Sequence, residues 1–223
     1  MSLTHLGIIA DGNRRWAVAQ GLPKIEGHTR GFKVIEDLVI AATKLNIPYV
    51  TFYVFSTENW GRAEAEVSHI MKLAETMIIK MAEKMAKNNV RLLILGSKKK
   101  VSPKLISLAE KAEKMTEECT GTTACFCFNY GGEQEISDAA NKALEAGEEI
   151  TPETIRKHLY KPEVPDVDMV VRTSGEERIS GFMLWRAAYA EFLFMKKYFP
   201  EMTGDDIKEI LKEYNKRNRR FGK

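Results

Sequence analysis

The stretch HLGIIADGNRRW at residues 5–16 joins a short apolar run to a glycine-containing turn and then to a polar segment. We expect the run Leu6–Ala10 to form a buried strand and Asn13–Gln20 to form a helix. The turn between them holds a carboxylate, and two arginines open the helix. A buried strand that leads directly into a helix is the repeating unit of an α/β fold.

The remaining sequence repeats this alternation of apolar runs and longer segments of helical period. The pattern predicts a single α/β domain, residues 1–223, in which helices flank a mostly parallel central sheet. Further strands are predicted at Tyr49–Phe55, Val90–Leu95, Thr122–Phe128, Val167–Val171 and Phe192–Met195. Further helices are predicted at His28–Leu45, Glu64–Lys87, Pro103–Cys119, Glu133–Glu145, Pro152–Leu159 and Asp205–Arg217.

The composition narrows the class of protein. A chain of 223 residues with 44% hydrophobic content can bury one substantial core, and a net charge of +3 does not indicate nucleic-acid binding. No apolar run approaches the roughly 20 residues of a membrane span, and the first residues do not resemble a signal segment. We expect a cytoplasmic protein and leave peripheral membrane contact open. The three cysteines lack the spacing of metal ligands, and we therefore expect them to be reduced residues of the core: Cys119, Cys125 and Cys127.

Polar residues follow three of the predicted strands, at the edge where open α/β sheets bind ligands. After the first strand, Asp11–Trp16 places a carboxylate, a flexible glycine and two guanidinium groups at a helix start. Such a helix start suits a phosphate group, and Asp11 could hold magnesium against that phosphate. The alternative is a structural turn in which Asp11 caps the helix and both arginines face solvent.

The other two polar segments also combine unusual residue types. Ser56–Arg62 holds hydroxyl, carboxylate, amide, indole and guanidinium groups. The alternative for this segment is a capped structural loop in which Trp60 packs into the core. In Arg172–Ser180, two arginines six residues apart flank a serine–glycine bend and could converge on one diphosphate. The alternative is a charged surface loop whose Arg and Glu side chains neutralise each other.

The order and spacing of these segments resemble the cis-prenyltransferase family, which includes undecaprenyl diphosphate synthase and dehydrodolichyl diphosphate synthase. The resemblance covers nearly the whole chain, so the probability that its ordered blocks agree by chance is very small. Those blocks are His5–Trp16, Gly27–His28, Phe55–Trp60, Asn129–Gly132, Arg172–Ser180, Ala188–Glu191 and Arg219–Gly222.

The resemblance implies a magnesium-dependent enzyme that condenses isopentenyl diphosphate onto an allylic prenyl diphosphate, namely farnesyl or geranylgeranyl diphosphate. The product would be a long-chain polyprenyl diphosphate, the precursor of a glycosyl carrier lipid. The resemblance also implies a homodimer and an apolar channel that holds the growing prenyl chain. Contact with nucleic acid is not expected.

Site residues follow from the same resemblance. Asp11 matches the catalytic aspartate that works with magnesium on the allylic diphosphate. Asn59 matches the second catalytic position and would position the proton lost from isopentenyl diphosphate, with a phosphate oxygen or Asp11 as acceptor. Glu191 matches a second metal carboxylate that can act across the subunit contact. Substrate-binding positions match at Gly12, Asn13, Arg14, Arg15, Trp16, Lys24, His28, Ser56, Thr57, Glu58, Trp60, Arg62, Arg172, Arg178, Ile179 and Ser180.

Several positions depart from the bacterial pattern, and some of them are more typical of archaeal and eukaryotic members. Glu177 stands where a bacterial histidine can reach the metal. We expect Glu177 either to join the magnesium site or to pair on the surface with Arg172 or Arg178. The departures leave the starter and the product length open, and they lie at Arg14, Lys24, Ala63, Ser174 and Glu177.

The helix predicted at Glu64–Lys87 carries an apolar stripe over about five turns. Such a stripe packs in a core or lines the channel, where methionine side chains adapt to a flexible chain. Its members are Val67, Ile70, Met71, Ala74, Met77, Ile78, Met81 and Met85.

Three other classes of protein remain as alternatives. A noncatalytic partner subunit of the same fold could dispense with Asp11 and the arginines, which this chain keeps. A nucleotide-handling α/β enzyme would carry a P-loop or a dinucleotide glycine fingerprint, and the sequence has neither. A trans-prenyltransferase would be mostly helical with paired aspartate-rich motifs, whereas Asp205 and Asp206 are typical of a helix start.

Overall fold

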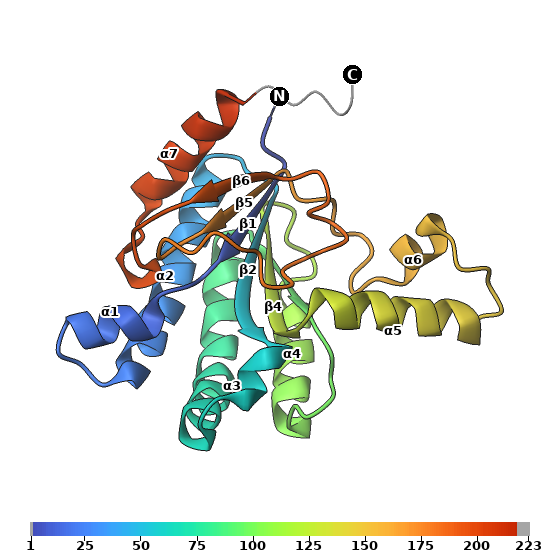
Figure 1. The fold of residues 1–223 in the computed structure, drawn as a ribbon, viewed down its shortest axis with the longest axis horizontal. Coiled ribbons are helices and arrows are strands. Elements are labelled where there is room, and N and C mark those ends of the chain that lie inside the picture. The colour runs from blue at the N-terminus through green and yellow to red at the C-terminus, as the bar shows by residue number, and fades with distance from the viewer. Residues whose placement is uncertain (1, 218–223) are drawn as a thin grey trace.

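A computed structural model describes residues 2–217 and confirms the α/β fold. Six strands form one sheet in the order β3-β4-β2-β1-β5-β6, and every neighbouring pair is parallel. Figure 1 shows this twisted sheet at the centre of the molecule. The strands are β1 (His5–Ile9), β2 (Tyr49–Ser56), β3 (Arg91–Leu95), β4 (Thr123–Tyr130), β5 (Met169–Arg172) and β6 (Glu191–Phe194).

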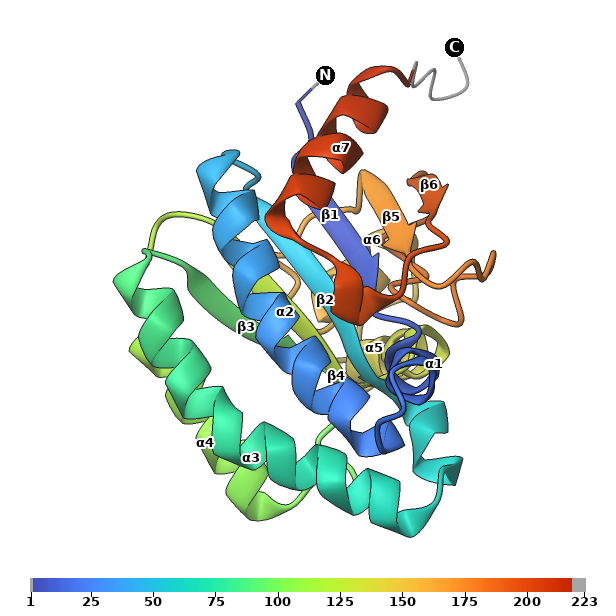
Figure 2. The same cartoon turned by 90° about the vertical axis from the view of Figure 1, so that its left-hand side faces the viewer.

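Helices flank the sheet as predicted. Figure 2 shows α2, α3, α4 and α7 on one face of the sheet, with α5 and α6 beyond the other face. The α-helices are α1 (Asn13–Ala19), α2 (Lys24–Lys44), α3 (Glu64–Lys87), α4 (Pro103–Met115), α5 (Gly132–Glu145), α6 (Pro152–His158) and α7 (Gly204–Asn215). Two 3₁₀ turns complete the fold, η1 (Thr57–Gly61) and η2 (Phe199–Glu201). Across the part of the chain described, no helix is long and apolar enough to cross a membrane.

Both faces of the sheet are buried. Ile8, Phe52 and Val171 lie side by side on three strands and pack in one core with α2, α3 and α7. The opposite face packs against residues that flank β5 in the sequence, among them Val164, Phe182 and Met183. Because neither face meets water, the strands appear in the sequence as continuous apolar runs. Cys125 and Cys127 are buried and free as predicted, whereas Cys119 is only half-buried.

Two predicted helix boundaries were wrong. α2 begins directly after Pro23 rather than at His28, because proline pre-sets the entry conformation of a helix. α4 ends before Cys119, because Thr116 leaves the helix and its hydroxyl accepts a hydrogen bond from the Leu92 N–H at 2.9 Å.

Helix α4 covers the outer edge of the sheet at β3. The N–H groups of Leu92 and Ile94 donate to Thr116 Oγ1 at 2.9 Å and to Glu113 Oε1 at 2.7 Å. Lys161 pairs with Glu113 at 2.8 Å. Side chains of one helix therefore satisfy backbone donors that an edge strand usually leaves to solvent.

The apolar stripe of α3 divides between core and cavity. Val67 and Ile70 pack against Phe55, and Met85 belongs to the main core. Three members of the stripe line a cavity between α3 and the sheet, and Met81 among them also belongs to the main core: Ala74, Ile78 and Met81. The stripe therefore packs largely in the core, and its role in a prenyl channel stays a prediction.

Candidate active site

The turn after β1 holds the carboxylate of Asp11 between two arginines. Arg172, at the end of β5, donates from Nη2 to Asp11 Oδ2 at 2.8 Å, and Arg15 Nη2 lies 3.4 Å from Oδ1. The Gly12 N–H donates to the same Oδ1 at 2.6 Å. Because β1 and β5 are adjacent and parallel, their carboxyl ends bring together residues 161 positions apart.

Asp11 is ionised at neutral pH. Partial burial by itself would raise the pKa of Asp11, but the hydrogen bond and the charge of Arg172 outweigh that effect. The Gly12 N–H and the charge of Arg15 lower the pKa further. The site therefore keeps a stable carboxylate that can bind a cation.

Gly12 permits the tight turn between Asp11 and α1. Its φ is 98°, and a Cβ there would stand 2.6 Å from the Tyr198 ring. The ring in turn lies under the Arg15 guanidinium, 5.9 Å from ring centroid to Cζ. Gly12 is also the N-cap of α1 and has no side chain to cap the first-turn N–H groups. The turn thus leaves backbone donors for another acceptor.

Arg172 also organises the loop that follows it. Its Nη1 donates to Ser180 Oγ at 2.8 Å and to the Arg178 carbonyl. The Arg172 side chain is only 6% exposed, yet its Nε has no hydrogen-bond partner within residues 2–217. The Arg178 side chain is 59% exposed. An anion bound beside this loop could engage both guanidinium groups.

Glu176, rather than Glu177, pairs with Arg178, and it also contacts Arg15. Its carboxylate pairs with Arg15 at 2.8 Å and with Arg178. Arg15 also donates to the Ser174 hydroxyl at 2.6 Å. Glu177 is exposed to solvent. The loop and the turn after β1 are therefore joined through Glu176.

A second charged network joins α1, α2 and α3 at Glu66. Its carboxylate lies 3.0 Å from Arg62, 3.2 Å from His28 and 3.6 Å from Arg14. Burial lowers the pKa of His28, and the charge of Arg62 adds to this against the opposing hydrogen bond with Glu66. His28 is therefore neutral near pH 7, and the arginines supply the positive charge.

These two networks border a cavity of about 630 Å³, which we call the polar cavity. Its lining contains eight of the predicted site residues and four basic side chains besides His28, a composition that suits a diphosphate. The lining residues are Ala10, Asp11, Gly12, Asn13, Arg14, Arg15, Val18, Ala19, Lys24, His28, Arg62 and Tyr198.

Ser56–Arg62 forms the turn η1 at the end of β2, and of this segment only Arg62 lines the polar cavity. Asn59 Oδ1 accepts a hydrogen bond from the Ser56 N–H at 3.2 Å, so the predicted catalytic amide caps its own turn. Trp60 packs edge to face on Phe55, as the structural alternative predicted. Trp16 and Ile179 are half-buried outside the cavity lining.

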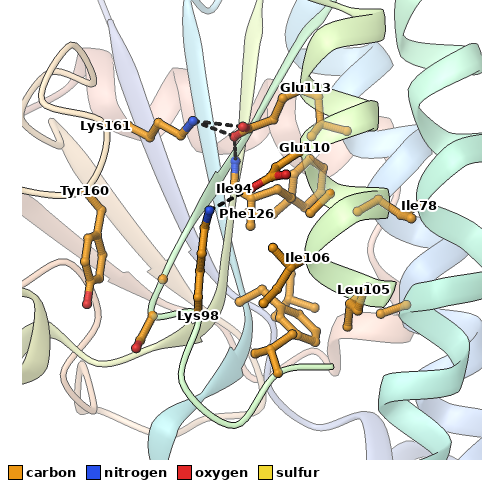
Figure 3. Close-up of a pocket in the computed structure, with 18 of the residues that line it drawn as sticks. Ile78, Ile94, Lys98, Leu105, Ile106, Glu110, Glu113, Phe126, Tyr160 and Lys161 are labelled. Atoms are coloured by element: carbon orange, nitrogen blue, oxygen red, sulfur yellow. Dashed lines mark hydrogen bonds and ion pairs between the residues drawn. The ribbon is translucent and has the colours of Figure 1, made fainter. Parts of the chain in front are cut away.

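A larger cavity of about 850 Å³, the apolar cavity, begins one helical turn further along α2. His28 lines the polar cavity, and Phe32 on the same helix face lines the apolar one. Figure 3 shows the apolar cavity between the sheet and helices α3 and α4, with charged pairs such as Lys98–Glu110 at its rim. Its apolar walls include Val54, Ile78, Ile94, Ile106, Phe126 and Phe128.

The structure does not bring Glu191 near Asp11 within one chain. Glu191 begins β6 opposite Met169, at the amino ends of the strands, whereas Asp11 follows the carboxyl end of β1. Glu191 lies 3.5 Å from Arg217. Across residues 2–217, no three His, Cys, Asp or Glu side chains group as a metal site. Of the three predicted metal ligands, Asp11 faces the polar cavity.

Sequence reasoning missed several residues of the site. Glu66 could have been found from its four-residue spacing from Arg62 at a helix start. The Thr173 hydroxyl donates to the Asp11 carbonyl at 2.7 Å, but nothing in the sequence distinguishes it within its segment. Tyr198 gave no signal, because only the fold brings it beside Gly12. The Arg219–Gly222 block lies outside the described residues.

Comparison with known proteins assigns the family. Residues 9–222 match the family model of undecaprenyl diphosphate synthase. The chain is 44% identical to the isoprenyl transferase of Thermotoga maritima, over 98% of this chain and 96% of that protein. It is 41% identical to the isoprenyl transferase of Rickettsia bellii, over 100% and 99%.

Solved structures agree with this assignment. Lavandulyl diphosphate synthase from Lavandula x intermedia, in complex with dimethylallyl diphosphate, superposes with a TM-score of 0.95 at 28% identity, over 100% and 99% of the two chains. A structure described as a probable undecaprenyl diphosphate synthase from Campylobacter jejuni gives a TM-score of 0.86 at 32% identity, over the whole of both chains. The chain belongs to the undecaprenyl diphosphate synthase family of isoprenyl transferases and is a prenyl-transferring enzyme.

Proposed function

We propose that this chain is a magnesium-dependent cis-prenyltransferase that condenses isopentenyl diphosphate onto farnesyl or geranylgeranyl diphosphate. The product would be a long-chain polyprenyl diphosphate that serves as the precursor of a glycosyl carrier lipid. One observation carries the proposal: a cation-lined polar cavity around Asp11 lies one turn of α2 away from an apolar cavity. A ligand with a diphosphate head and a hydrocarbon tail matches that arrangement.

The two diphosphates are assigned to different parts of the site. The allylic diphosphate would bind in the polar cavity, where Arg14, Arg15 and the start of α1 provide donors. The diphosphate of isopentenyl diphosphate would bind at Arg172, Arg178 and Ser180, which one hydrogen-bonded loop holds together. Asp11 stands between the two sites, because its carboxylate contacts both Arg15 and Arg172.

The reaction breaks one carbon–oxygen bond and forms one carbon–carbon bond. As the allylic diphosphate leaves, negative charge grows on its oxygens, and the surrounding guanidinium groups stabilise that charge. The double bond of isopentenyl diphosphate attacks the allylic carbon, and the new chain loses a proton. Asn59 would position that proton, with a phosphate oxygen or Asp11 as the acceptor.

Magnesium fits the residues that are present. Mg²⁺ in proteins is usually held by one or two carboxylates together with substrate phosphates, and Asp11 is an ionised carboxylate on the wall of the polar cavity. When bound there, the cation would neutralise part of the charge on the leaving diphosphate.

Glu191 can reach such a site only from a second copy of the chain, since its own strand places it at the far end of the sheet. We therefore keep the homodimer and the metal role of Glu191 as proposals that stand together. Cytoplasmic location and peripheral membrane contact for product release complete the proposed function.

Glu177 remains a candidate third ligand, because it is exposed beside the loop that holds Arg172 and Arg178. If Glu177 supports the metal, Glu177→Gln should raise the magnesium concentration for half-maximal rate about 10-fold, and Glu177→His should restore it. An unchanged magnesium titration for Glu177→Gln would leave Glu177 as a surface charge. Glu118→Gln, at an exposed glutamate in the segment between α4 and β4, is the matched control.

The decisive experiment for the proposed function is a product assay. Purified protein is incubated with Mg²⁺, labelled isopentenyl diphosphate and each of several allylic starters, and the products are separated by chromatography. We expect polyprenyl diphosphates with farnesyl or geranylgeranyl diphosphate and none after chelation of the metal. Failure with every starter would support the noncatalytic partner subunit instead.

A further inference from the structure

Asn129 stands at a junction between two parts of the proposed active site. It lies near the end of β4 and is only 2% exposed. Its φ is 50°, in the left-handed region that non-glycine residues seldom adopt, although asparagine tolerates it better than most. Surrounding contacts must hold a residue in such a conformation, and residues of this kind cluster at functional sites.

The Asn129 amide makes three hydrogen bonds. Oδ1 accepts from the Trp60 Nε1–H at 2.8 Å, and Nδ2 donates to the carbonyls of Ser97 and Lys99, each at 2.7 Å. The partners fix the orientation of the amide, because an indole N–H only donates and a carbonyl only accepts. The Ser97 N–H donates back to the Asn129 carbonyl at 3.0 Å.

On one side, these contacts fix the turn η1. Trp60 directly follows Asn59, so the bond to Asn129 holds the chain next to the proposed catalytic amide. Gly131 lies so close to the start of the same turn that a Cβ at that position would be 2.5 Å from Thr57 Oγ1. The end of β4 therefore holds η1 at both its first residue and its fourth.

On the other side, the contacts fix a wall of the apolar cavity. Residues 97–99 follow β3 and line this cavity. Figure 3 shows Lys98 reaching across the cavity toward α4, where it pairs with Glu110 at 2.7 Å. The same amide thus joins the wall beside which a prenyl chain would lie to the turn that carries Asn59.

We propose that Asn129 is a positioning residue that fixes the turn η1, which carries Asn59, against segment 97–99 of the cavity wall. This inference rests on the proposed function and deepens it, because Asn129 lines neither cavity and would act through the turn that carries Asn59. Misplacement of a catalytic group by about 1 Å can lower a rate about 100-fold. One buried amide with three hydrogen bonds is enough to set such a distance.

Two substitutions isolate the role of Asn129. Asn129→Gly keeps the left-handed backbone and removes all three side-chain hydrogen bonds. Trp60→Phe removes the indole donor alone and keeps an aromatic ring against Phe55. The matched control is Asn89→Gly, because Asn89 is also left-handed (φ 55°) and its amide bonds to Thr120 at the opposite end of β3.

Asn129→Gly should lower kcat by about 10- to 100-fold, while KM for isopentenyl diphosphate changes much less. The double variant Asn129→Gly/Trp60→Phe should be no slower than the slower single variant, because both changes break the same link. Asn89→Gly should keep wild-type kcat. A merely structural role would instead lower the folded fraction, leave kcat per folded molecule unchanged, and overturn the inference.

A second readout does not depend on activity. Acrylamide quenching attributable to Trp60 is the difference between a protein and its Trp60→Phe counterpart, and it should rise in Asn129→Gly. Unchanged quenching would overturn the inference. Full activity of Asn129→Gly beside loss of activity in Asn59→Ala would overturn the inference alone. Wild-type protein that makes no polyprenyl product from any starter would overturn the proposed function and the inference with it.

Discussion

Two arginine–carboxylate pairs in this protein have the same length and opposite surroundings. Arg186 contacts Glu135 at 2.8 Å, and Arg172 contacts Asp11 at 2.8 Å. Both side chains of the first pair are 0% exposed, whereas the Asp11 side chain is 28% exposed. The first pair lies inside the fold, and the second faces a cavity.

The two pairs also differ in how completely their polar atoms are satisfied. Arg186 donates further to the carbonyls of Val164, Tyr160 and Lys161, and Glu135 also accepts from the Tyr130 hydroxyl at 2.5 Å. Arg172 retains a buried Nε without a partner among the described residues. The Arg186–Glu135 pair is therefore closed to any ligand, whereas the Asp11 carboxylate of the other pair stays partly exposed on the wall of the polar cavity.

We call Arg186–Glu135 the sealed pair and Arg172–Asp11 the open pair. Breaking the sealed pair should give the largest effect. Arg186→Met leaves the Glu135 carboxylate buried without its partner, so the free energy of unfolding should fall by about 3–5 kcal/mol. Urea unfolding measures this change. Lys208→Met, which breaks an exposed pair with Asp205, should leave the free energy of unfolding nearly unchanged.

Replacing both partners of the sealed pair tests the reason for that loss. Arg186→Met/Glu135→Gln should recover much of the lost stability, because no unpaired charge remains inside the protein. If the double variant is as unstable as Arg186→Met, packing rather than charge accounts for the effect, and the comparison between the two pairs fails.

Acid should lower the free energy of unfolding through His5, which is buried between Thr51 and the Pro165 carbonyl. Burial, aided by the charge of Arg186, lowers the pKa of His5 to about 4. The unfolded chain takes up this proton near pH 6.5, so stability is full above that pH and falls progressively toward pH 4. The loss should reach about 3 kcal/mol by pH 4.

Urea unfolding at several pH values checks this dependence. His5→Gln cannot titrate, so its stability should change less over the same interval, apart from contributions that other groups make in both proteins. Equal slopes for His5→Gln and the wild type between pH 6.5 and pH 4 would show that His5 is not the responsible group.

Breaking the open pair should affect turnover rather than folding. Asp11→Ala should lower kcat by at least about 100-fold, because metal-assisted stabilisation of the leaving group supplies several kcal/mol. Its free energy of unfolding should change far less than that of Arg186→Met. Asp205→Ala, an exposed aspartate elsewhere, is the matched control. Near-normal kcat at saturating Mg²⁺ would remove Asp11 from the mechanism.

The smallest effect is expected at Arg178, in the loop that follows Arg172. Arg178→Ala should raise KM for isopentenyl diphosphate about 10-fold, the lower end for a hydrogen bond to a charged group, since Arg178 is largely solvent-exposed. Affinity for the allylic starter, measured by direct binding, should change much less. Equal weakening of both ligands would mean that the two diphosphate sites are assigned wrongly.

The sequence indicated the strands correctly because both faces of the sheet are buried, which leaves continuous apolar runs. It also marked the segments that hold Asp11 and Arg172. It could not show that these two residues touch, because their contact depends on β1 and β5 being neighbours in the sheet. The same limit hid Tyr198 and the choice of Glu176 over Glu177 as the partner of Arg178.

The sealed pair was invisible in the sequence for a different reason. Glu135 stands in the first turn of α5, where an acidic residue is typical of a solvent-facing helix start. Periodicity distinguishes apolar from polar positions, but it does not show that a distant arginine covers one of the polar ones. Buried ion pairs therefore need the tertiary structure before they can be recognised.

The covering of β3 by α4 has a consequence for how the protein behaves at high concentration. An uncovered strand edge offers a row of backbone groups on which another polypeptide can add a strand, and this is a common route to aggregation. At Leu92 and Ile94 the outward N–H groups are already occupied by Thr116 and Glu113. The wall of the apolar cavity is thereby also a barrier against intermolecular strand addition.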